Sequence, residues 1–241
     1  MSLGFEIVDD PGRACAALMV GAAIGGGEIV LAGGSTPKAA YGHFVDTVTT
    51  VGLNLDGTTF WIGDERCVEP DDERSNYRMI KQSLIDPLQG VTTVDVRRIR
   101  GELGPVEAAE EYDQLLRQDG GPNFDLVLLG IGPDGHTASL FPGQATVQER
   151  LRLAVAVPEA GLEPFVPRVS LTVKALSSAQ RVVFLASGGS KADAIVEAFG
   201  DDAEPDPAVP ASLLVPDSKL VTVLLDRAAA ARLGPRELAD E

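Results

Sequence analysis

Short runs of apolar, often β-branched residues recur along the 241-residue chain and predict a series of buried strands. The runs are apolar at consecutive positions, which is typical of strands that are covered on both faces. They occupy residues 28–32, 59–62, 94–99, 124–129, 153–157, 169–173, 182–186 and 220–225.

Segments with helical spacing separate most of these runs, at residues 11–24, 37–48, 76–85, 105–116 and 190–199. In the fourth of them, Val106, Ala109, Tyr112 and Leu116 fall on one stripe. Alternation of buried strands with helices predicts an open, mainly parallel, doubly wound α/β sheet of Rossmann-like type, with helices on both faces. Ligands of such sheets bind at the carboxyl ends of the strands.

The pattern predicts a single domain over residues 1–241, because no repeat or low-complexity segment interrupts it. The acidic, proline-rich stretch 200–210 reads as a surface loop, since a strand-like run still follows it. Residues 1–3 can be a remnant of cloning and are left out of the fold prediction.

Composition narrows the classes of partner. The formal net charge is −16, which disfavours nucleic acid and anionic membranes as partners. An anionic ligand would therefore need positive charge supplied locally. There is neither a basic, apolar N-terminal signal nor an apolar run of about 18 residues, so we expect a cytoplasmic protein that does not span a membrane.

The two cysteines, Cys15 and Cys67, show no disulfide framework or metal-ligand spacing. They are expected to be reduced, as in a cytosolic protein. The neighbour of Cys67 is Arg66, which leaves open a somewhat activated thiol.

The loop after the first run reads LAGGSTPK, in which Gly33 and Gly34 turn the chain into a helix. Pro37 fits the first helical position and Thr36 the cap, with Ser35 before it. Free backbone N–H groups and the positive helix end make this a candidate phosphate site. An ordinary capped turn remains the alternative, and the spacing of a Walker loop is absent.

The loop after the second run reads FWIGDER and continues to SNYRM, where Ser75 is a candidate helix cap. Asp64 could orient a water molecule or a sugar hydroxyl, and Arg66 could meet an anion or developing negative charge. Both can equally be solvated turn residues.

The stretch GIGPDGHTASLFPG contains Gly130, Gly132 and Gly135 in the G-x-G-x-x-G spacing of a dinucleotide-binding turn. That motif needs a full helix after its third glycine, but Pro142 and Gly143 stop any helix within about two turns. Pro133 removes a backbone donor that a pyrophosphate would use. Glu159 lies about where a dinucleotide-binding fold has its ribose-binding acid, and is the remaining argument for a nucleotide. A nucleotide site is therefore the minor alternative.

The favoured interpretation of the same stretch is a loop that presents His136 near the start of a short helix. Asp134 and Gly135 shape a tight turn in this loop. The ordinary pKa of histidine, near 6.5, suits proton transfer at neutral pH. The other histidine, His43, falls inside the second helical segment and is interpreted as structural.

Two basic residues follow toward the C-terminus. Arg168 precedes the run 169–173, and Lys191 stands in GGSKA after the run 182–186. Two glycines, the Ser190 cap and Lys191 form a second candidate anion site, although surface exposure explains a lysine equally well.

Together the motifs LAGGSTP, WIGDERCV with SNYRM, FDLVLLGIGPDGHTASLFPG, PRVSLT and SGGSKA resemble the glucosamine-6-phosphate isomerase/6-phosphogluconolactonase family, in family order and over nearly the whole chain. In the deaminase branch the residues after the histidine typically run to Phe-Asn-Glu-Pro-Gly. Here Leu140 and Phe141 precede Pro142-Gly143, so the chain resembles the lactonase branch. The resemblance implies hydrolysis of 6-phospho-D-glucono-1,5-lactone, a small sugar phosphate, with no cofactor and no metal.

On this reading His136 takes a proton from the attacking water, and Arg66 with nearby N–H groups steadies the oxyanion or the sugar. Asp64 and Asp134 orient His136 or ring hydroxyls. The residues expected to bind the substrate and its phosphate are Gly33, Gly34, Ser35, Thr36, Gly132, Arg168 and Lys191. A deaminase/isomerase and a non-catalytic sugar-phosphate-binding protein are the alternatives, and a monomer or weak homo-oligomer is expected.

Overall fold

A seven-stranded parallel sheet forms the centre of the computed structural model, which describes residues 2–118 and 121–234. Its strand order is β1-β10-β9-β6-β2-β3-β5, and neighbouring strands pair in parallel throughout. The strands are β1 (Ser2–Ile7), β2 (Glu28–Leu31), β3 (Thr59–Ile62), β5 (Asp95–Arg97), β6 (Leu126–Leu129), β9 (Arg181–Ala186) and β10 (Leu220–Leu225). The mainly parallel α/β sheet predicted from the sequence is confirmed.

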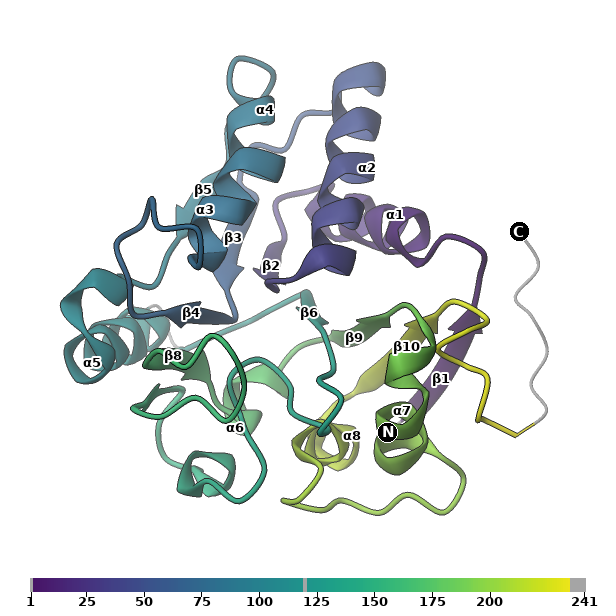
Figure 1. The fold of residues 1–241 in the computed structure, drawn as a ribbon. Helices are drawn as coiled ribbons and strands as arrows, with labels where there is room; N and C mark the ends of the chain where they lie inside the picture. The colour runs from purple at the N-terminus through teal and green to yellow at the C-terminus, as the bar shows by residue number, and fades with distance from the viewer. Residues whose placement is uncertain (1, 119–120, 235–241) are drawn as a thin grey trace.

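Helices cover both faces of this sheet (Figure 1). Connections from β1 through β5 run toward one edge, and those after β5 run back, so right-handed crossovers place the two groups of helices on opposite faces. The first group is α1 (Pro11–Ala23), α2 (Ser35–Val51), α3 (Asn76–Ile80), a π-helical turn (Lys81–Ile85) and α4 (Asp86–Leu88). The second group is α5 (Pro105–Leu116), α6 (Val173–Leu176), α7 (Ala192–Phe199) and α8 (Leu214–Asp217).

A second, three-stranded antiparallel sheet corrects the sequence prediction. The runs 153–157 and 169–173 do form strands, β7 (Ala154–Val157) and β8 (Arg168–Leu171), but these pair with each other outside the main sheet. Their partner β4 (Asp64–Arg66) was predicted as a loop. Strand β1 was also missed, because residues 1–3 were left out. In each case pairing with distant strands, rather than local pattern, decided the outcome.

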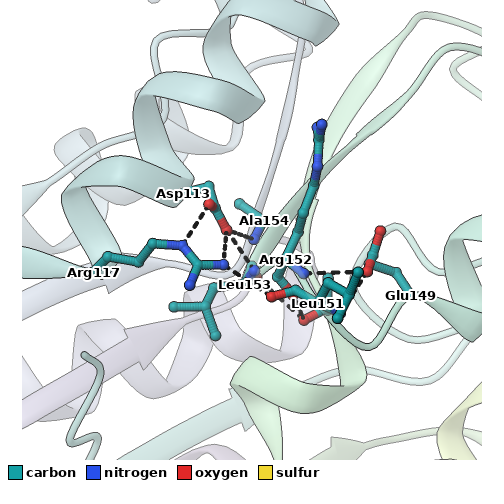
Figure 2. A network of polar contacts seen from close by, with 8 residues as sticks. Asp113, Arg117, Glu149, Leu151, Arg152, Leu153 and Ala154 are labelled. Atoms are coloured by element: carbon teal, nitrogen blue, oxygen red, sulfur yellow. Dashed lines mark hydrogen bonds and ion pairs between the residues drawn. The ribbon is translucent and has the colours of Figure 1, made fainter. Parts of the chain in front are cut away.

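Helix α5 ties the small sheet to the rest of the molecule (Figure 2). The Asp113 carboxylate accepts hydrogen bonds from the N–H groups of Leu153 at 2.5 Å and Ala154 at 3.3 Å. Arg117 donates to Asp113 at 2.7 Å and to the carbonyl of Leu151 at 2.9 Å. The start of β7 is therefore anchored to one helical turn.

Two buried tyrosines fix the carboxyl ends of the central strands. Tyr41 of α2 accepts from the N–H of Ala32 at 2.9 Å and donates to the carbonyl of Ala32 at 2.7 Å, directly after β2. Tyr112 of α5 accepts from the N–H of Ile62 at 3.0 Å, at the end of β3. Because both hydroxyl groups are fully paired, they hold the strand ends from which the next loops depart.

The strand order reverses between β2 and β6, which are neighbours in the sheet. The connection after β2 leads toward β3, whereas the one after β6 leads toward β9, so the two loops diverge. This is the topological switch point at which open α/β sheets bind ligands. Within the described part of the chain, no helix is long and apolar enough to span a bilayer.

Candidate active site

A cleft of about 270 Å³ opens at this switch point. It is lined by the loops after β2, β3, β6 and β9, and by the segment that leads into β8. Ten of the eleven predicted site residues line it: Gly33, Gly34, Ser35, Thr36, Asp64, Arg66, Gly132, His136, Arg168 and Lys191. The eleventh, Asp134, contacts one of them, as described below.

Helix α2, which follows the glycine loop after β2, starts two residues earlier than predicted. Ser35 is the first helical residue, and Gly34, with φ 109°, occupies the cap position without a side-chain hydrogen bond. The predicted Thr36 cap and the placement of Pro37 at the first helical position are therefore wrong. The N–H groups of Ser35 and Thr36 lie in the first helical turn, where the helix offers them no acceptor.

Gly33 is required by a neighbouring side chain. A Cβ built on Gly33 would lie 2.1 Å from Oδ1 of Asn76, the first residue of α3. Asn76 donates to the carbonyl of Asp64 at 2.8 Å and to its carboxylate at 3.2 Å. The glycine thus lets Asn76 bridge the loops after β2 and β3 from one side of the cleft.

The histidine loop forms turns and contains no helix, which corrects the predicted short helix after His136 and removes the structural basis for a dinucleotide motif. The N–H of Gly132 donates to the carbonyl of His136 at 2.8 Å and closes the turn. Thr137 donates to the carbonyl of Gly130 at 2.9 Å. Gly135 has φ 77°, a conformation that disfavours a side chain.

His136 and Asp134 form a close pair. Nδ1 of His136 lies 2.5 Å from the Asp134 carboxylate, so the tautomer protonated at Nδ1 donates to it and leaves Nε2 as an acceptor. Burial raises the pKa of Asp134, but the hydrogen bond and charge of His136 outweigh it and lower the pKa below its ordinary value. A Cβ on Gly132 would lie 2.0 Å from the imidazole, so this glycine makes room for the ring.

Asp64, unlike Asp134, contacts groups other than His136. Its buried carboxylate accepts from the hydroxyl of Ser139 at 2.6 Å, and the described contacts include none with His136. Of the two acids proposed to orient the histidine, the structure places Asp134 beside it. Ser139 in turn accepts a long hydrogen bond of 3.4 Å from Nη1 of Arg168. Asp64 therefore links the floor of the cleft to the cationic side chain of β8.

Arg168 is buried, with a relative exposure of 3%. Its guanidinium lies 5.2 Å from the Phe141 ring centroid, and that ring is 4.8 Å from the His136 ring. Burial lowers the pKa of Arg168, the Asp64 charge raises it and the Arg66 charge lowers it again. Nε of Arg168 and Nε of Arg66 are buried without a hydrogen-bond partner among the described residues. Buried N–H groups of this kind require an acceptor, which an anionic ligand can supply.

Lys191 reaches the cleft from the turn after β9. It ends a short 3₁₀ turn (Gly189–Lys191) and precedes α7, and neither helix has a side-chain cap, so the predicted Ser190 cap is wrong. Burial lowers the pKa of Lys191, and the negative charge of Asp134 partly opposes that shift. The lysine charge therefore lies close enough to feel the histidine–aspartate pair.

The sequence did not single out Asn76, which lines the cleft, or Ser139 and Glu65, which hydrogen-bond to cleft residues. Glu65 is buried and accepts from the N–H groups of Arg66, Asn76 and Tyr77 and from the Ser75 hydroxyl. Burial raises the pKa of Glu65 against these hydrogen bonds. All three lay inside quoted motifs, but their contacts join segments that are distant along the chain. The predicted Ser75 cap is confirmed by its hydrogen bond from the N–H of Arg78 at 3.1 Å.

Two further sequence interpretations are settled by geometry. Burial raises the pKa of Cys67 to about 11, and the Glu65 charge adds to this, so the activated thiol is wrong. His43 lies on α2 with Nε2 3.1 Å from Asp10, away from the residues that line the cleft. Among the described residues, no group of three or more His, Cys, Asp or Glu side chains is arranged to hold a metal ion.

A doubly wound α/β fold with an acid–histidine pair and two arginines whose buried Nε–H groups lack an acceptor at its switch point is typical of proteins that bind small anions. Comparisons with known proteins narrow that class. The model of the family described as glucosamine-6-phosphate isomerases/6-phosphogluconolactonase matches residues 15–223. The chain belongs to this family.

Relatives agree with that assignment. The chain is 36% identical to the 6-phosphogluconolactonase of Haemophilus influenzae, over 84% of this chain and 85% of that protein. It is 37% identical to the human 6-phosphogluconolactonase, over 83% and 78% of the two chains. The solved structure of 6-phosphogluconolactonase from Trypanosoma brucei superposes with a TM-score of 0.81 at 27% identity and covers 97% of this chain and 99% of that one.

Proposed function

We propose that this protein hydrolyses 6-phospho-D-glucono-1,5-lactone to 6-phospho-D-gluconate. The observation that carries the proposal is the pairing of His136 with Asp134 in a cleft that also holds Arg66, Arg168 and Lys191. Relatives named 6-phosphogluconolactonase, which match most of the chain, support the same reaction.

Arg168 and Lys191 hold the substrate phosphate. Nε of Arg168 is a buried donor that needs an acceptor, and Lys191 adds a second positive charge. The first-turn N–H groups of Ser35 and Thr36 add the positive end of α2. This local charge offsets the net charge of −16, which would otherwise repel a phosphate.

His136 acts as the general base. Asp134 holds the tautomer with Nδ1 protonated, so Nε2 accepts a proton from a water molecule as its oxygen bonds to C1 of the lactone. The former carbonyl oxygen becomes an oxyanion, which Arg66 and nearby N–H groups stabilise. No covalent intermediate with the protein is needed, because a lactone is an activated ester.

Collapse of the tetrahedral intermediate completes the reaction. The bond between C1 and the ring oxygen breaks, and the protonated His136 returns its proton to that oxygen as it becomes the C5 hydroxyl. The new carboxylic acid loses its proton to solvent at neutral pH. The product therefore carries two anionic groups where the substrate carried one.

The deaminase alternative is disfavoured by the residues after the histidine. That reaction needs an acidic side chain there, but the buried apolar side chains of Leu140 and Phe141 occupy the positions. A sugar-phosphate-binding protein without activity would have no use for the close pair of Asp134 and His136.

The testing experiment compares lactone hydrolysis with the spontaneous rate, with the lactone made in place from glucose 6-phosphate. We expect His136→Ala to lower kcat roughly 100- to 10,000-fold, the scale of a lost general base. His43→Ala is the matched control, because it removes the other histidine outside the cleft. No acceleration by folded wild-type protein would refute the lactonase proposal, and full activity of His136→Ala would refute the mechanism.

A further inference from the structure

Glu163 places a carboxylate in a cleft that otherwise gathers positive charge. It lines the cleft from the segment that joins β7 to β8, and its side chain is exposed. Among the described residues, no hydrogen bond or ion pair engages its carboxylate. The other carboxylate that lines the cleft, Asp64, is engaged by Ser139 and Asn76. Glu163 is therefore available to a ligand as a free negative charge.

The backbone around Glu163 is held by groups of the site itself. Nη2 of Arg168 donates to the carbonyl of Leu162 at 2.8 Å and to the carbonyl of Pro164 at 3.1 Å, the two neighbours of Glu163. A Cβ on Gly161 would lie 2.9 Å from the Phe141 ring, so the segment also rests against that ring. Because the Phe141 ring packs against His136, the segment links Arg168 to the histidine side of the cleft.

Charge explains what a carboxylate does there. Three cations line the cleft and would hold a doubly anionic product more tightly than a singly anionic substrate. We propose that Glu163 is a specificity-determining residue, which disfavours ligands with a second anionic group besides the phosphate and so favours release of the hydrolysed product. The proposal rests on the lactonase function proposed above.

The test uses two stable sugar phosphates that differ at C1. Glucose 6-phosphate carries only the phosphate, whereas 6-phosphogluconate also carries a carboxylate. Calorimetric titration is expected to show that Glu163→Gln binds 6-phosphogluconate roughly three- to tenfold more tightly than wild type. Its affinity for glucose 6-phosphate should change less than about twofold. The gain should shrink as added salt screens the charge.

Glu159→Gln is the matched control, because Glu159 is an exposed acid of the same segment that does not line the cleft. It is expected to leave both affinities unchanged. If Glu163→Gln changes the affinity for both ligands equally, or leaves the affinity for 6-phosphogluconate unchanged, this inference is wrong. Lactone hydrolysis by wild-type protein would still support the proposed function. Failure of wild-type protein to bind either sugar phosphate would overturn the proposed function and this inference together.

Discussion

Single residues carry the chemistry proposed here, and their protonation follows from their surroundings. Nδ1 of His136 lies 2.5 Å from the Asp134 carboxylate, and Gly132 leaves space for the ring. The sequence pointed to all three residues, because glycines and one histidine in a short turn after a buried strand are a local signal. It did not indicate that Asp64 faces Ser139 instead, since that contact joins residues 75 positions apart.

Lys191 leads to a pH-dependence. Burial lowers its pKa from the ordinary 10.5, so its positive charge is lost at a lower pH than for a solvated lysine. We expect the affinity for 6-phosphogluconate to weaken as pH rises from about 8 to 10, a range in which phosphate and carboxylate are already fully ionised. Lys191→Arg should keep a flat profile, because arginine stays charged. Calorimetric titration across this pH range measures the affinity of both proteins. If the affinity falls equally with pH in wild type and Lys191→Arg, Lys191 does not bind the anion.

Arg168→Ala tests the phosphate assignment directly. Loss of a buried guanidinium that donates to an anion should raise KM for the lactone roughly tenfold or more. Steady-state kinetics on the lactone made in place measures this, with circular dichroism to check folding. Unchanged KM in a folded variant would contradict a role of Arg168 in binding the phosphate.

Elements of secondary structure were predicted well where their pattern is local. The helices of the first face and the apolar strands of the large sheet follow from periodicity and from proline and glycine boundaries. The small sheet was not predicted, because β4 is three residues long and is defined only by its pairing with β8. Without that pairing, Asp64 and Arg66 look like turn residues.

The anchor between α5 and β7 leads to a stability prediction. Asp113→Ala removes two backbone hydrogen bonds, from Leu153 just before β7 and from Ala154 at its start, and the ion pair with Arg117. It should cost about 1–3 kcal/mol of unfolding free energy at pH 7. Burial raises the pKa of Asp113, but Arg117 and the N–H groups lower it further, so the net shift is downward from 3.8. The stabilisation is therefore present above that value and is lost as pH falls through the lowered pKa.

Urea unfolding at pH 7 and at pH 3 measures this difference. Glu110→Gln, an exposed acid on the same helix, serves as the control and should change stability by less than about 0.5 kcal/mol. A deficit in Asp113→Ala that stayed the same or grew at low pH would contradict the assigned charge effect.

At the scale of the whole molecule, one hydrophobic core contains residues of both sheets, including Val169 and Leu171 of β8 with Val30 and Val127 of the large sheet. We therefore expect one cooperative thermal transition, with equal calorimetric and van't Hoff enthalpies. Product at 100 times its dissociation constant should stabilise the native state by about 2.7 kcal/mol. Scanning calorimetry without and with product measures the number of transitions and the stabilisation. Two transitions, of which only one moves to higher temperature with product, would indicate independent domains.

The sequence by itself determined the parallel α/β architecture and the four loops that carry the chemistry, because strands, helices and turns of this kind are set by neighbours along the chain. Only the tertiary structure decided which charges meet. It brought Arg168 to Ser139 and Asp64, placed Asn76 over Gly33, and held the segment around Glu163 through Arg168 and Phe141. Most of these contacts join segments far apart in the chain, and their geometry depends on how the small sheet packs beside the large one.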